Sequence, residues 1–153
     1  MPNKKKSEQG RKSRAAGARF ELKVRGFMED EGWIVDKWIN NVDLNEKKLV
    51  KAKRKFNPYM KILGIGTGFP DFIAFKTKGK NYEVIGLEVK GNGWLDRTEK
   101  EKCNFLLDKK IFSNILIAKK GKKRGKIEFL DFKKKVWQNL KLPICFSLHA
   151  FTL

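Results

Sequence analysis

Apolar positions along the chain repeat with two different periods, and their order predicts alternating helices and strands. Helical spacing marks residues 14–31, where the apolar residues are Phe20, Val24, Phe27 and Met28. The elements expected after it are strands at 33–39, 72–75 and 84–87, a helix at 96–110, strands at 113–119 and 126–132, a short helix at 133–140 and a strand at 144–151. This order predicts an α/β domain with a central mixed β-sheet flanked by helices.

Acidic and basic side chains stand at the ends of the two central apolar runs. Asp71 opens the first run, and Glu88 and Lys90 close the second. Turn residues at 77–81 join the runs, so we expect a hairpin that brings Asp71 close to Glu88 and Lys90. Since strand side chains alternate between faces, Glu88 and Lys90 project from one face. Two carboxylates and one ammonium on neighbouring strands suit a divalent metal with a positioned water.

The charge of the chain narrows the class of partner. Among 153 residues, 36 Lys and Arg outweigh 17 Asp and Glu, and the net charge of +19 favours nucleic acid ahead of an anionic membrane. The length suits one domain. No apolar stretch approaches the roughly 20 residues of a membrane span, and no signal peptide is evident, so we expect a cytoplasmic protein.

Basic residues gather in three segments. Residues 1–13 are expected to form a mobile basic arm ahead of a domain at 14–153, and residues 40–61 a long basic insert. The alternative for the insert is a solvated helix over 44–54. A third segment is the basic turn at 119–125. The residues expected to contact nucleic acid are Arg14, Arg19, Lys51, Lys53, Arg54, Lys55, Thr67, Lys122, Lys123 and Arg124.

Other reactive residue types support no second site. Cys103 falls on the apolar face of the helix at 96–110 and is expected in the core, while Cys103 and Cys145 have neither zinc-ligand spacing nor a disulfide framework. His149 is the only histidine, and a structural role is the simpler interpretation. The glycines at 64, 66 and 68 are not followed by Lys-Ser/Thr, so we do not interpret them as a nucleotide-binding loop.

The order of elements and charged residues resembles the PD-(D/E)XK nuclease superfamily over residues 14–132. A helix with Glu21, a strand beginning Pro-Asp at Asp71 and a strand ending Glu-Val-Lys at Lys90 carry the resemblance. Residues 14–21 look like the first helix of archaeal Holliday junction resolvases, and residues 68–75 with 87–91 look like VRR-NUC nucleases. The insert is longer than the usual resolvase connection. Where VRR-NUC proteins tend to carry a glutamine, this chain has Glu99-Lys-Glu-Lys102.

The resemblance implies a single restriction-endonuclease-like domain that acts as a Mg²⁺- or Mn²⁺-dependent DNA endonuclease. It implies metal ligands at Asp71, Glu88 and the Val89 carbonyl, with Glu21 direct or through water, and a catalytic Lys90. The implied substrate is branched DNA, cut by a homodimer. The open alternatives are a restriction-like, homing or VRR-NUC-type repair nuclease, and a non-catalytic nucleic-acid-binding protein with a nuclease fold. The charged residues could also form only a surface ion-pair set.

Overall fold

A computed structural model describes residues 4–58, 61–65 and 68–138 of the chain. Its elements are α1 (Lys4–Asp30), β1 (Ile34–Lys37), β2 (Asn40–Asp43), β3 (Lys48–Lys51), β4 (Arg54–Asn57), β5 (Ile62–Ile65), β6 (Phe72–Lys78), β7 (Asn81–Val89), α2 (Arg97–Asp108), β8 (Asn114–Lys120), β9 (Ile127–Asp131) and β10 (Val136–Gln138). The predicted α/β class is confirmed. No helix in the described ranges is long and apolar enough to cross a membrane.

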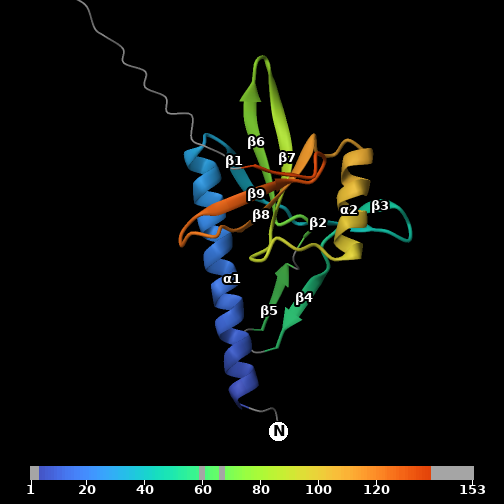
Figure 1. Ribbon diagram of the computed structural model, residues 1–153. Coiled ribbons are helices and arrows are strands. Elements are labelled where there is room, and N and C mark those ends of the chain that lie inside the picture. Colours follow the sequence, from blue (N-terminus) through green and yellow to red (C-terminus); the bar gives the residue numbers. More distant parts are fainter. Residues whose placement is uncertain (1–3, 59–60, 66–67, 139–153) are drawn as a thin grey trace, which may run out of the picture.

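A six-stranded mixed sheet forms the centre of the molecule, in the order β1-β6-β7-β8-β9-β10 (Figure 1). The predicted hairpin is present as β6 and β7, which pair antiparallel with Phe72 opposite Leu87. Strands β7 and β8 are parallel, and α2 makes the crossover between them. The remaining neighbours in this sheet are antiparallel. The crossover places the carboxyl end of β7 and the start of α2 at one edge of the sheet.

The two helices cover opposite faces of the sheet, each over its own apolar cluster (Figure 1). Helix α1 contributes Phe20, Val24 and Met28 to a cluster that includes Leu87. Helix α2 contributes Cys103 and Leu106 to the second, so the predicted core position of Cys103 is confirmed. Because strand residues alternate, Leu87 faces α1 and its neighbour Glu88 faces α2.

Helix α2 begins as its sequence predicts. The Asp96 carboxylate accepts a hydrogen bond from the Glu99 N–H (2.8 Å), and the Glu99 carboxylate accepts one from the Asp96 N–H (3.0 Å). This reciprocal pair is a capping box, which satisfies amide groups that the first turn leaves without helical partners.

The N-terminal segment differs from the expected mobile arm. Helix α1 already begins at Lys4, so residues 4–13 are helical and the helix does not start after Ser13. This segment lacks apolar periodicity, but Lys, Arg, Glu and Gln are good helix formers. Lys12 and Glu8 also form an ion pair one turn apart, at 2.9 Å. The predicted helix start at residue 14 was wrong because it relied on an apolar stripe.

The insert contains hairpins and no helix over 44–54. Strands β2 and β3 pair antiparallel, and β4 and β5 form a second two-stranded sheet. The Asp43 carboxylate accepts hydrogen bonds from the N–H groups of Asn45 (3.0 Å) and Glu46 (3.1 Å), which turns the chain between β2 and β3. Local side-chain bonding of this kind competes with helix formation.

A helix over 133–140 and a strand over 144–151 were expected near the C-terminus, and the structure describes part of the first. Residues 132–135 form turns and are followed by β10, so the helix expected over 133–140 is wrong within its described part. The Asp131 carboxylate accepts from the Lys134 N–H at 2.9 Å and holds this turn. The strand expected at 144–151 and His149 lie outside the described residues.

Candidate active site

Three predicted site residues meet at the edge where β6 begins and β7 ends. The Asp71 N–H donates to Oε2 of Glu88 (3.1 Å), and the Val89 N–H donates to Oδ2 of Asp71 (2.9 Å). Oε1 of Glu88 lies 3.4 Å from Nζ of Lys90. We call Asp71, Glu88 and Lys90 the charged cluster. Its members come from two adjacent strand ends, as the hairpin predicted.

Strand register explains why the cluster forms. Phe72 pairs with Leu87, so Asp71 falls opposite Glu88 as the chain enters β6. Val89 directs its N–H to Asp71, and the N–H and C=O of a strand residue point to the same side. The Val89 carbonyl therefore also faces the side on which Asp71 lies. The carbonyl oxygen of Val89 is therefore a candidate metal ligand beside the two carboxylates.

Burial dominates the electrostatics of the two carboxylates. Glu88 is only 5% exposed, and desolvation followed by the charge of Asp71 raises its pKa to about 8. Desolvation also raises the pKa of Asp71, while its hydrogen bond from Val89 opposes the rise. A buried and a half-buried carboxylate this close cannot both ionise cheaply without a neighbouring cation. A second cation, in addition to the Lys90 ammonium, would therefore stabilise the ionised forms of Asp71 and Glu88.

Lys90 is held between two acidic side chains. Its ammonium donates a short hydrogen bond to Oε1 of Glu99 and lies near Glu88. Burial lowers the pKa of Lys90, but the hydrogen bond to Glu99 and the charges of Glu88 and Glu99 together outweigh burial and raise the pKa. Lys90 thus remains an ammonium at neutral pH, with a defined position.

Glu99 is a site residue that the sequence analysis identified only as part of a capping box. One carboxylate oxygen caps α2, and the other binds Lys90. The available signal was topological, because a helix that follows a strand in a crossover begins beside the carboxyl end of that strand. Since Lys90 directly follows β7, the first turn of α2 was the place to look for its partner.

Glu21 lies near the charged cluster but is not hydrogen-bonded to it. Oε2 of Glu21 accepts from Nζ of Lys37 at 2.7 Å, and Lys37 pairs across β1 and β6 with Phe72. The charge of Glu21 nevertheless raises the pKa of Asp71. The structure therefore brings Glu21 to the neighbourhood of Asp71 from α1, with a lysine as its direct partner.

The carboxylates of the site can be compared with the ligands that a divalent metal uses. Within the described parts of the chain, no three His, Cys, Asp or Glu residues are arranged to hold a metal ion. Asp71 and Glu88 nevertheless fit Mg²⁺, because Mg²⁺ keeps several waters and commonly uses only one or two protein carboxylates together with substrate phosphate. Their raised pKa values indicate the same need for a cation. The arrangement can hold a metal and orient a water beside an ammonium.

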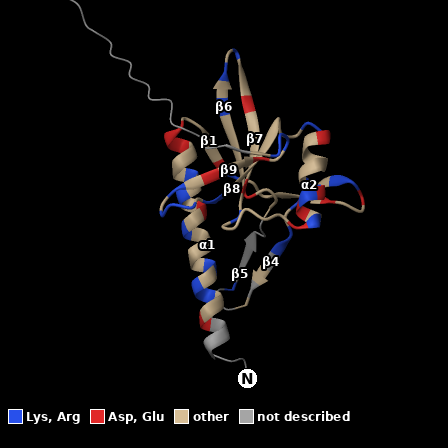
Figure 2. Ribbon diagram, in the orientation of Figure 1, with Lys and Arg blue, Asp and Glu red and all other residues tan. Residues whose placement is uncertain are grey.

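The predicted nucleic-acid contacts divide into two groups by position. Figure 2 shows Lys and Arg along α1 and in the turn between β8 and β9. The predicted contacts that line one cleft beside α1 are Arg19, Lys122, Lys123 and Arg124. The second group lies on the N-terminal part of α1 (Arg14) or on the insert (Lys51, Lys53, Arg54 and Lys55). Arg14, Lys51, Lys53 and Arg54 are exposed, and the side chain of Lys55 is not described. Thr67 lies outside the described residues. The structure therefore brings only the first group together.

Comparison with known proteins adds no assignment. The chain matches no family model, no curated protein and no solved structure.

Proposed function

We propose that the protein is a metal-dependent DNA endonuclease with a restriction-endonuclease-like fold, related to the PD-(D/E)XK nucleases. The observation that carries the proposal is the charged cluster of Asp71, Glu88 and Lys90 at one edge of a mixed sheet. Charged groups at the ends of buried strands are costly unless they are paired or used. Here burial raises the pKa of both carboxylates, that of Glu88 to about 8, whereas a structural ion-pair set would hold them low.

Asp71 and Glu88 would hold Mg²⁺ or Mn²⁺ through carboxylate oxygens, next to the Val89 carbonyl. When bound, the metal supplies charge to polarise the scissile phosphate and lowers the pKa of its water. The Lys90 ammonium, held by Glu99, orients the attacking water and offsets negative charge that develops on the phosphate. Glu21 adds negative charge from α1 without a hydrogen bond to Asp71.

The substrate side of the proposal is branched DNA cut by a homodimer. A net charge of +19 supports a polyanionic substrate. A four-way junction has two-fold symmetry, and paired cuts need two sites, which a symmetric dimer supplies. This part of the proposal follows the resemblance of residues 14–21 to resolvases, and restriction-like or repair nucleases remain its competitors.

A non-catalytic nucleic-acid-binding protein is the second candidate. The observation in its favour is that Glu21 pairs with Lys37, so the described residues present two carboxylates and no third acidic ligand in one group. Such a protein would bind DNA with the same salt dependence but would have no activity for a chelator to remove.

Cleavage assays separate these candidates. Wild-type protein with Mg²⁺ is incubated with four-way junction, flap, duplex and single-stranded DNA, beside Asp71→Asn, Glu88→Gln and a matched control, Glu83→Gln. Glu83 also lies on β7 but pairs with Lys78 away from the cluster. We expect cleavage by wild type and Glu83→Gln, a loss of roughly 100-fold or more in the two cluster variants, and no activity in EDTA.

The pattern of products assigns the substrate. Paired symmetric nicks on the junction alone support a resolvase, whereas cuts in flaps or plain duplex support the broader nuclease alternatives. Cleavage by Asp71→Asn at the wild-type rate would refute the assigned site. Salt-sensitive binding without any cleavage by the wild type would leave the non-catalytic candidate.

A further inference from the structure

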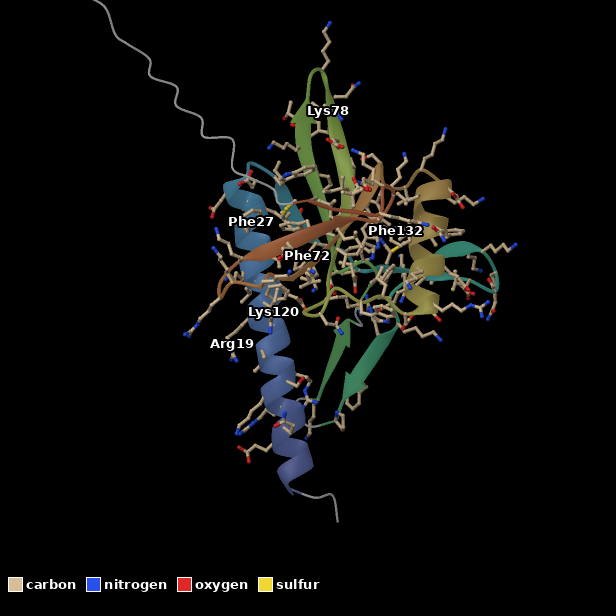
Figure 3. The ribbon with its side chains drawn as sticks, viewed as in Figure 1. Arg19, Phe27, Phe72, Lys78, Lys120 and Phe132 are labelled. Atoms are coloured by element: carbon tan, nitrogen blue, oxygen red, sulfur yellow. The ribbon has the colours of Figure 1, made fainter. Side chains whose placement is uncertain are left out.

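A second feature of the molecule is a cleft between α1 and the turn that joins β8 to β9. Its volume is roughly 700 Å³. Seven cationic side chains line this basic cleft, and they are Arg19, Lys23, Lys120, Lys122, Lys123, Arg124 and Lys126. Figure 3 shows Arg19 and Lys120 side by side next to α1. The cleft combines residues from segments about a hundred positions apart in the sequence, so it exists only in the folded chain.

Specific contacts hold the walls of the basic cleft together. Nζ of Lys23 donates to the Gly125 carbonyl at 2.6 Å and fastens the turn to α1. The Gly121 N–H donates to the Lys126 carbonyl at 2.9 Å, which closes the base of the turn. The Lys120 ammonium lies 5.6 Å from the centre of the Phe20 ring. The cationic groups are therefore presented by an ordered turn against a helix.

The basic cleft carries uncompensated positive charge. None of its lining residues is acidic. Glu128, on β9 next to the turn, is 3.0 Å from Nζ of Lys119 and accepts from the Lys122 N–H at 3.4 Å, so it is already engaged. Cationic walls of a concave surface concentrate the field and raise the local concentration of anions. The ligand of such a cleft is a polyanion.

The basic cleft adjoins the charged cluster around the end of the sheet. The Lys120 N–H donates to the carbonyl of Gly91, the residue after Lys90, at 3.2 Å. Phe20, which lies under Lys120, directly precedes Glu21. A chain of phosphates bound in the cleft can therefore continue toward the cluster. This continuity links the two features to one extended ligand.

The described lining favours duplex backbone over single strands. Single-strand sites usually present aromatic rings for base stacking. The one aromatic ring in the lining belongs to Phe20, which is 8% exposed and covered by Lys120. The lining also lacks Asn and Gln, which read adenine edges, and lysines on a turn bind phosphates as point charges.

We propose that the basic cleft binds the phosphodiester backbone of a duplex DNA segment that flanks the cleaved position, without regard to base sequence. The proposal rests on the proposed nuclease function for the position of the cut, but its binding test does not require cleavage. It makes α1 and the β8–β9 turn the surface that orients a duplex arm relative to Asp71 and Lys90.

The test compares two variants with the same charge change. Arg19→Ala/Lys123→Ala/Arg124→Ala removes three cations from the basic cleft and leaves Lys23, which fastens the turn. Lys78→Ala/Lys80→Ala/Lys133→Ala removes three exposed cations elsewhere, and Figure 3 shows Lys78 at the far tip of the β6–β7 hairpin. Both sets are made in an Asp71→Asn background, and circular dichroism with thermal melting checks their folding.

Binding to duplexes of two unrelated sequences and to a single strand is followed by fluorescence anisotropy between about 50 and 200 mM salt. For the cleft variant we expect a loss of duplex affinity of about ten-fold or more, equal for both sequences, and a salt slope smaller by up to about 3. The control should stay close to its parent. Equal affinities and slopes for the two variants would overturn the proposal, as would a larger loss on the single strand.

The proposed nuclease function and the proposed role of the basic cleft can be refuted independently. If the wild type binds duplex through the basic cleft but cuts no DNA, the nuclease function is wrong and the cleft stands as a backbone-binding surface. If the wild type cuts DNA and the cleft variant binds duplex like the control, the nuclease function stands and the cleft proposal is wrong. A single Arg19→Ala variant, which leaves the turn untouched, repeats the comparison if the triple variant misfolds.

Discussion

Glu99 shows how one side chain can serve a helix and a neighbouring cation together. Its carboxylate has two oxygens, of which one completes the capping box of α2 and the other binds Lys90. The capping contacts fix the carboxylate in space, so the Lys90 ammonium is held by a rigid partner. Local helix chemistry thereby positions the group proposed to orient water.

Glu99→Gln should separate these two roles. The amide keeps an oxygen for the cap but loses the negative charge that raises the pKa of Lys90. We expect the alkaline limb of the pH–rate profile for DNA cleavage to move to lower pH, with a rate loss of about ten-fold at neutral pH and almost unchanged thermal stability. Cleavage rates measured across pH check this.

The matched control for this variant is Glu101→Gln on the same helix. Glu101 pairs at 2.9 Å with Arg97 on the solvent side, and its loss should leave the profile unchanged. If Glu99→Gln and Glu101→Gln give the same pH profile, Glu99 does not position Lys90.

The sequence was informative about residues whose placement depends on strand alternation alone. Asp71, Glu88 and Lys90 were predicted to meet because hairpin pairing and a period of two place them. The pairings of Glu99 with Lys90 and of Glu21 with Lys37 depend on how the helices pack on the sheet, which no local pattern encodes. Four of the seven cations of the basic cleft were among the predicted contacts. Lys23, Lys120 and Lys126 were not, because the cleft forms only when the turn packs against α1.

At the scale of elements, the insert enters and leaves the sheet next to Asp71. The Trp38 N–H donates to the Asp71 carbonyl at 3.1 Å, and the Phe69 N–H donates to the Asn40 carbonyl at 2.8 Å. Gly68 lies in this crossing, where an added Cβ would be 2.3 Å from the Trp38 carbonyl oxygen and 2.6 Å from that of Asn40. Both neighbours are backbone atoms, so neither can rotate away.

Gly68→Ala should therefore destabilise the fold and displace Asp71. We expect a loss of roughly 1–3 kcal/mol in the free energy of unfolding, measured with urea, and reduced cleavage. Gly17→Ala is the matched control on α1, since nothing lies within 4 Å of its added Cβ. That control should stabilise the helix by up to about 1 kcal/mol. Equal effects of the two substitutions would show that the crossing tolerates a side chain.

Elements with both an apolar pattern and a boundary signal were predicted well. Helix α2 has a capping box, and β6 and β7 flank a glycine-containing turn. The start of α1 and the strands of the insert were missed, because charged helix formers and short turn-stabilised hairpins show no apolar period. At both places the structure depends on polar interactions between near neighbours.

At the scale of the whole molecule, the buried carboxylates couple stability to pH. The pKa of Glu88 is raised from 4.5 to about 8. Between these values the folded protein keeps a proton that the unfolded chain releases, so this group's contribution to stability falls as pH rises through that window. The raised pKa of Asp71 acts in the same direction.

We expect the metal-free protein to lose thermal stability from about pH 5 to about pH 8, and Glu88→Gln to lose less. The proposed Mg²⁺ would bind the ionised carboxylates, so its stabilising effect should be larger at pH 8 than at pH 6. Melting temperatures with and without Mg²⁺ across this range check both effects. An identical pH dependence in wild type and Glu88→Gln would contradict the burial argument.

The segment from Asn40 to Phe69, which contains the insert, is closed by a hydrogen bond from the Phe69 N–H to the Asn40 carbonyl. Within this segment, β2 packs on the core through Val42, and Asn41 accepts a hydrogen bond from Lys102 on α2, whereas residues 45–49 are exposed. The exposed turn between β2 and β3 can therefore change in length while the pairing of β1 with β6 next to Asp71 stays the same.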